Sequence, residues 1–289
     1  VITTLYETVF EKCESHYKYK VLNLGSAKEL PAPFPWFSSQ TLMEAINDLA
    51  LQYPFLAISK TKQSNEILLK LIKILYYQAS QYENLSKCNV FEQNNLKWCD
   101  LLIGTHDNDY YRSLILMLDF YNDLKGLVYT FDKLGEEMIP DSVYSDYLRK
   151  YGTDFTAEMC DYFIIKTGHL SKLFRIFKSN TDPVVKSMLT HYFNENRALY
   201  GSVVWMDDVI NEDYLGASSA LYNLSQDLSK PPKFQAKQFE LSFSKLALLL
   251  ATQDKPVSEL APTVDQQLMK IQTGLYELKA QKVLFDKLQ

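Results

Sequence analysis

The chain has 289 residues and a formal net charge of −5, with 47% hydrophobic and 22% charged residues. This composition can bury a core and excludes wholesale disorder, and a mildly acidic chain is a poor binder of phosphate backbones, whose affinity comes from clustered cations. Nine Gly and ten Pro are few for this length, which argues against a turn-rich all-β fold, whereas aromatic residues reach 13%.

Helical spacing dominates the chain from end to end. Apolar residues recur at steps of three and four, which places them on one face of a 3.6-residue helix, and no run of strict alternation marks a strand. One such stripe, Phe239, Phe243, Leu246 and Leu250, is predicted to be a core-facing side of its helix. In chain order, the expected helices lie near 2–18, 38–53, 64–86, 90–102, 107–121, 123–135, 141–150, 154–166, 169–178, 182–194, 196–209, 211–227, 233–252 and 264–287.

Start signals support several of these helices. Thr41 with Glu44, and Thr263 with Gln266, have the spacing of a capping box, and Asp182 precedes a Pro at the first helical position. The segments 107–135 and 182–209 are the places where two expected helices could merge into one.

Short loops leave successive helices antiparallel. The sequence therefore predicts an all-α fold, an irregular α-solenoid of stacked antiparallel helical hairpins. A weak seam at Tyr151-Gly152-Thr153 suggests an upstream α-helical stack over 1–150 and a C-terminal α-helical block over 151–289.

Catalytic motifs are absent from the sequence. The nine glycines never come within two residues of one another, which excludes glycine-framed nucleotide loops and the nucleophile elbow. The four cysteines, Cys13, Cys88, Cys99 and Cys160, are scattered and form no Cys-x-x-Cys pair, so they are interpreted as buried apolar residues in a reducing compartment. No enzyme activity, cofactor or metal is expected.

One acidic pair allows an alternative interpretation. Asp207-Asp208 resembles the aspartate-rich helix of all-α isoprenoid enzymes, which bind magnesium diphosphate between two acidic motifs. The second motif is missing here, because the positions after Asn122-Asp123 lack the expected hydroxyl and carboxylate. The acids are therefore predicted to border a helix–helix turn, where they favour the N-terminus of the next helix.

A cationic cluster near the middle of the chain has two interpretations. Its members recur about one helical turn apart, so they are interpreted as a solvated helix face, with a specific anionic partner as the alternative. The cluster consists of Lys166, His169, Lys172, Arg175 and Lys178.

Four stretches together resemble the nucleoporin 133 family. Asp109–Val128 is similar to a helix pair of that family, and Tyr151–Phe174 to the segment that follows it there. Trp205–Asn211, followed by Tyr214, Ala217, Leu221 and Leu224, and Phe243–Leu249 resemble two later helices. The resemblance covers about residues 105–289.

The resemblance implies a scaffold protein of the Y-shaped nuclear pore coat complex at the nuclear envelope, with a role in pore assembly and in mRNA and protein transport. It implies nucleoporin 84 (nucleoporin 107 in animals) and other Y-complex nucleoporins as partners, with no direct contact of this segment to nucleic acid or membrane. The implied contact segment is about Tyr151–Phe177, and its candidate partner-binding residues are Tyr162, Phe163, Leu170, Leu173, Phe174 and Phe177.

These apolar residues have an equal structural interpretation, namely packing on the preceding helix, because core and interface stripes look alike in a sequence. The alternative functions are a helical-repeat adaptor of another large assembly, such as a vesicle coat, and the isoprenoid-type enzyme. An exposed apolar patch near 170–177 would favour the pore scaffold over the adaptor.

Overall fold

The computed structural model describes residues 39–56, 62–80, 85–227, 234–253 and 262–288, and in these residues every regular element is a helix. They divide into two compact units, Val1–His169 and Leu170–Gln289. The all-α prediction is confirmed. The expected helix at 2–18 and Cys13 lie outside the described residues.

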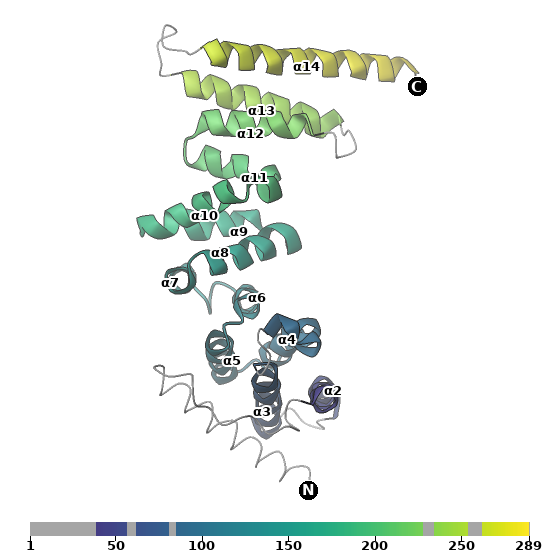
Figure 1. Ribbon diagram of the computed structural model, residues 1–289, viewed down its shortest axis with the longest axis vertical. Helices are drawn as coiled ribbons and strands as arrows, with labels where there is room; N and C mark the ends of the chain where they lie inside the picture. Colours follow the sequence, from purple (N-terminus) through teal and green to yellow (C-terminus); the bar gives the residue numbers. More distant parts are fainter. Residues whose placement is uncertain (1–38, 57–61, 81–84, 228–233, 254–261, 289) are drawn as a thin grey trace. The chain divides into compact units, whose positions relative to one another are not determined.

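The first unit consists of helices that pack mainly on near neighbours in the chain. Pairs in contact include α2 with α3, α4 with α5, α5 with α6, and α7 with α8, while α4 also contacts α6 and α6 contacts α8 (Figure 1). Its elements are α2 (Gln40–Leu56), α3 (Lys62–Ala79), η1 (Leu85–Lys87), α4 (Asn89–Ile103), α5 (Asn108–Phe120), α6 (Leu124–Leu134), α7 (Asp141–Tyr151), α8 (Thr153–Cys160) and the π-helical η2 (Asp161–Lys166).

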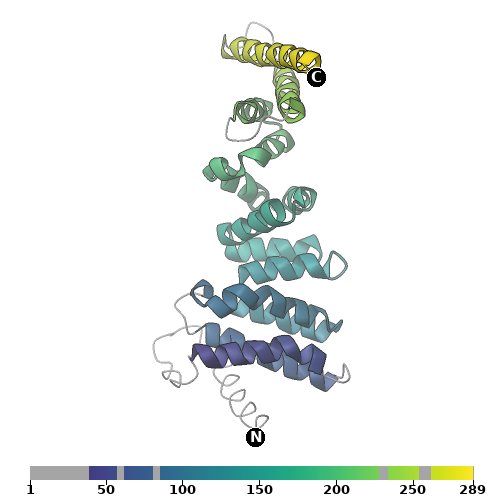
Figure 2. The ribbon, with the colours of Figure 1, turned by 90° about the vertical axis from the view of Figure 1, so that its right-hand side faces the viewer.

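In the second unit each helix contacts the next one along the chain. The contacts run from α9 to α10, and so on to α13 with α14, and the helices of each unit can be followed side by side in Figure 2. The elements are α9 (Leu170–Lys178), α10 (Pro183–Glu195), α11 (Arg197–Ile210), α12 (Tyr214–Ser225), α13 (Phe234–Thr252) and α14 (Pro262–Leu288). Helix α11 bends at Tyr200, whose backbone leaves the helical region (φ −106°, ψ 16°).

Most predicted boundaries agree with these helices, with local exceptions. Helix α3 ends at Ala79 and not at 86, and α2 begins at Gln40, so Thr41 lies inside the helix and the expected capping box does not start it. The Asp182 cap is confirmed, because its side chain accepts a 2.9 Å hydrogen bond from the Val184 amide. The merged helices at 107–135 and 182–209 do not occur.

The reason that α5 and α6 stay separate is a tight corner. Asn122 has φ 56°, and the Asp123 amide donates to the Leu118 carbonyl five residues back (2.9 Å). The Asp123 carboxylate then accepts from the Gly126 amide (2.9 Å) and caps α6. A side chain at Gly126 would collide with this cap, because its Cβ would lie 2.5 Å from an oxygen of Asp123.

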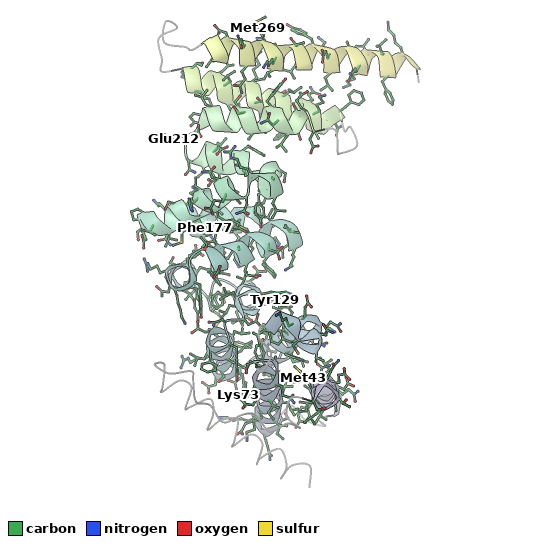
Figure 3. All side chains as sticks on the ribbon, viewed as in Figure 1. Met43, Lys73, Tyr129, Phe177, Glu212 and Met269 are labelled. Carbon is green, nitrogen blue, oxygen red and sulfur yellow. The ribbon has the colours of Figure 1, made fainter. Side chains whose placement is uncertain are left out.

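The same corner recurs between α11 and α12. Glu212, labelled in Figure 3, has φ 62°, the Asp213 amide donates to the Asp208 carbonyl (2.8 Å), and Asp213 accepts from the Gly216 amide (2.9 Å). Both helix pairs are therefore turned by the pattern Asp-x-x-Gly after a residue with positive φ, with the cap buried in the first unit and exposed in the second.

The core of the first unit is aromatic. Tyr76 is fully buried against the rings of Phe91 (centroids 5.1 Å apart) and Trp98 (5.8 Å), and its hydroxyl donates to Asp123 (2.7 Å). Burial is the main cause that raises the pKa of Asp123, while the hydrogen bonds from Tyr76 and Gly126 act in the opposite direction. The aromatic excess of the sequence thus fills helix interfaces here.

The seam expected at 151–153 lies inside the first unit. Gly152 takes φ 58° between α7 and α8, and these two helices pack on each other. The units divide instead between His169 and Leu170, just after Gly168, which has φ 72°.

Candidate partner-binding segment

Helix α9 is short and strongly two-sided. It reads Leu-Ser-Lys-Leu-Phe-Arg-Ile-Phe-Lys, and its apolar residues recur at steps of three and four. Leu173, Phe174, Ile176 and Phe177 are buried, and the Phe174 ring lies 6.4 Å from that of Phe193 in α10. The apolar side of α9, which includes Phe177 (labelled in Figure 3), is therefore part of the protein core.

The six candidate residues are almost all buried within the chain. Five of them have exposed fractions of 8% or less, and only Leu170 is half-buried. An exposed apolar patch near 170–177, which would favour the pore scaffold, is not formed by this stripe. The buried residues are Tyr162, Phe163, Leu173, Phe174 and Phe177.

Two of the six residues belong to the first unit. Tyr162 and Phe163 lie in η2, where the chain continues from α8 with wider turns, and the Tyr162 hydroxyl donates to Asp132 of α6 (3.0 Å). Burial, followed by the nearby Asp132 carboxylate, raises the pKa of Tyr162. This tyrosine therefore remains a neutral donor that holds η2 against α6.

A polar network fastens the end of α9 to α11. The Lys178 ammonium lies 3.0 Å from Oδ1 of Asp207, whose side chain is only 1% exposed. Lys178 also donates to the Asn211 side chain (2.6 Å), which in turn donates to Asp207 (3.0 Å) and to Thr190 of α10 (3.0 Å). These contacts join α9, α10 and α11.

The network changes the interpretation of the cationic cluster. Lys178 is paired with Asp207, and Lys166 lies 2.5 Å from Asp161 within η2. His169 is exposed. Because two of the cations already neutralise acids of this chain, the cluster is not a continuous site for an anionic ligand.

The acidic pair on α11 is likewise occupied. Asp208 is 5% exposed and accepts two hydrogen bonds of 3.2 Å from Arg197. Burial is the largest effect on the pKa of Asp208 and raises it, while Arg197 lowers it. With Asp207 paired to Lys178, the two carboxylates contact separate cations and do not share a ligand site, so they border the helix–helix turn as the sequence predicts.

Within the described residues, no three acidic, histidine or cysteine side chains gather at metal-binding distance. The three cysteines among them, Cys88, Cys99 and Cys160, are buried and form no disulfide. No helix in this part of the chain is long and apolar enough to cross a membrane.

The apolar stripe predicted to face the core on α13 faces outward instead, so this prediction is wrong. Phe239, Phe243, Leu246 and Leu250 are 41–52% exposed, and α13 instead packs through Leu241, Ser244, Ala247 and Leu248. Small residues decide the packing: Ser244 hydrogen-bonds the Ser218 hydroxyl (3.1 Å) and carbonyl (2.8 Å) of α12, so the two helices approach closely. The small residues Ser244 and Ala247, spaced for one helix face together with Leu241 and Leu248, were the sequence signal for the buried side, and ranking residues by hydrophobicity alone misses it.

Fold and site together define a class: a helical protein whose elements pack on near neighbours and whose conspicuous polar groups are structural. Residues 71–289 match the model of the non-repetitive/WGA-negative nucleoporin C-terminal family, and the chain belongs to this family. It is therefore a nucleoporin segment, part of the nuclear pore complex at the nuclear envelope.

Two curated fungal proteins are similar. The chain is 26% identical over 307 aligned positions to nucleoporin NUP133 of Saccharomyces cerevisiae, covering 98% of this chain and 25% of that protein. It is 31% identical over 136 positions to nucleoporin nup132 of Schizosaccharomyces pombe, covering 47% of this chain and 11% of that protein. The chain thus spans about a quarter of the first relative and about a tenth of the second.

Proposed function

We propose that this chain is a solenoid segment of the Y-shaped coat complex that holds a neighbouring nucleoporin in place, and thereby supports pore assembly and nucleocytoplasmic transport. The observation that carries the proposal is the family match over 71–289, on a chain whose helices pack mainly on near neighbours. Such packing suits a spacer, because the binding surface grows with the number of helices and no enclosed pocket is needed.

The partner we propose is nucleoporin 84, or nucleoporin 107 in animals, bound through the segment around η2 and α9. Because Leu173, Phe174 and Phe177 are buried, their role is to position α9, and direct contact falls to side chains that remain accessible. Accessible apolar side chains of this segment include Leu170, half-buried at the start of α9, and Ile165, 57% exposed in η2.

The experiment is a binding titration of the purified chain with the nucleoporin 84 homologue of the same organism, read by isothermal calorimetry. Leu170→Glu and Ile165→Glu, made separately, are expected to weaken binding at least tenfold while the thermal transition stays unchanged. Val184→Glu is a matched control, because Val184 is 61% exposed on α10 outside this segment; it should bind like the parent chain.

A second variant separates contact from positioning. Leu173→Asp places a carboxylate at a fully buried position, so it should lower both the thermal transition and the affinity. Undiminished binding by both folded Glu variants would reject the proposed contact segment, and no binding by the parent chain would reject the partner.

A further inference from the structure

Helix α13 presents a continuous apolar row to solvent. Phe239, Phe243, Leu246 and Leu250, hereafter the α13 face, are exposed by 44%, 42%, 52% and 41%. Trp205 of α11 extends this row, because its ring lies 6.1 Å from that of Phe239 and 6.3 Å from that of Phe243. Single exposed apolar residues are ordinary, but a contiguous row of this kind marks a contact surface.

The α13 face carries no charge. The exposed residues beside it are neutral: Gln235, Gln238, Ser242 and Gln253. At about 100° per residue, Lys237, Glu240 and Lys245 lie roughly 90° or more away from the row, on the half-buried sides of the helix. An anionic lipid surface is not favoured as the occupant, because such binding uses lysines and arginines that flank the apolar stripe.

The spacing of the α13 face reads the same in both directions, with steps of four, three and four residues. A second copy in antiparallel orientation, related by a two-fold axis between positions 244 and 245, would place Phe239 opposite Leu250 of the partner subunit. Phe243 would then lie opposite Leu246 of the partner subunit. Each layer pairs one aromatic with one aliphatic side chain, which is the self-complementarity that a two-fold interface requires.

We propose that the α13 face binds the α13 face of a second copy of this chain, in an antiparallel helix pair flanked by Trp205. Because the α13 face carries no charge, two copies can bring their α13 faces together without electrostatic repulsion. This goes beyond the proposed function, since it joins two scaffold segments to each other and does not involve the neighbouring nucleoporin.

The size of the face determines the expected strength. With about 200 Å² for a fully exposed large side chain, the four residues leave on the order of 350 Å² of apolar surface per copy. Interfaces that bury less than about 1,200 Å² in total are weak and transient. The pairing is therefore expected to be weak and to depend on concentration, and to be reinforced where copies are held close together in an assembly.

Sedimentation velocity of the purified chain over about 1–300 µM tests the proposal. The average sedimentation coefficient of the parent chain should rise with concentration toward that of a dimer. Phe243→Lys or Leu246→Glu alone should weaken dimerisation at least tenfold. The double variant, with both substitutions in one chain, should regain dimerisation, because the antiparallel register sets the two introduced charges of opposite sign against each other.

Loss of dimerisation must be distinguished from loss of folding in the variants. All substituted positions are about half exposed, so circular dichroism and the thermal transition should match the parent, and Val184→Glu should dimerise normally. A parent chain that stays monomeric at every concentration overturns the proposal, and so does a dimer that both single variants form unchanged. Flotation of the monomer with neutral phosphatidylcholine vesicles, abolished by Phe243→Lys, would equally overturn it and assign the face to lipid.

Discussion

The contact between Lys178 and Asp207 is expected to control how firmly α9 is held. Lys178→Met leaves the Asp207 carboxylate, 1% exposed, without its cation. Removing one partner of a buried ion pair costs about 3–5 kcal/mol, and because the Lys178 side chain is 20% exposed, the lower end of about 3 kcal/mol applies.

The double variant Lys178→Met with Asp207→Leu removes both charges. An apolar pair of similar volume is often neutral relative to the ion pair, so most of the loss in the single variant should be recovered. The resulting coupling energy between the two positions is expected to be on the order of 2–3 kcal/mol.

Urea unfolding followed by circular dichroism measures these differences. With a denaturant slope of about 1.5–3 kcal/mol/M, a loss of about 3 kcal/mol moves the midpoint of the affected transition down by about 1–2 M. Hydrogen exchange of peptides from α9 should show the same order of variants. A double variant as unstable as the single one, or a single variant that loses under about 1 kcal/mol, would refute the reasoning.

Two further predictions concern the recurring Asp-x-x-Gly corner. Gly126→Ala should destabilise the chain by about 1–3 kcal/mol in thermal or urea unfolding, because the buried Asp123 cannot move away from the new Cβ. Gly216→Ala should cost under about 1 kcal/mol, since the exposed Asp213 can rotate, and equal losses in the two variants would contradict this explanation. Burial raises the pKa of Asp123, so the native state binds this proton more tightly than the unfolded chain does. The contribution of the protonated Asp123 to the free energy of unfolding is therefore fully present below pH 3.8 and is lost as the pH rises through the native pKa. Asp123→Asn should therefore flatten the fall in stability above pH 3.8, measured by urea titration at several pH values, and an unchanged slope would show that Asp123 is not its source.

The sequence predicted the helices well because local rules govern them. Asp182 followed by Pro183 marks a start that needs no tertiary information, and it is confirmed. The sequence predicted two separate helices here and left their merger open, because the separation of α5 from α6 depends on Asn122 adopting a positive φ, which spacing alone does not show.

The direction in which a helix faces was harder to predict. In α13 the sequence offered a large apolar stripe and a stripe of small residues, and hydrophobicity favoured the stripe that proved to be exposed. The contact between Ser218 and Ser244 determines the outcome, and it joins residues that are 26 positions apart. For the same reason the burial of Leu173 and Phe174 in α9 could not be distinguished from an interface before the neighbouring helices were known.

Packing between consecutive helices in the second unit has a consequence for how this part of the protein acquires its structure. Residues that touch across α10, α11, α12 and α13 are close in the chain, so little loop-closure entropy opposes each step, and low contact order goes with fast folding. Each helix can dock as soon as it follows its predecessor, so the second unit is suited to assembling progressively while it is still being synthesised on the ribosome.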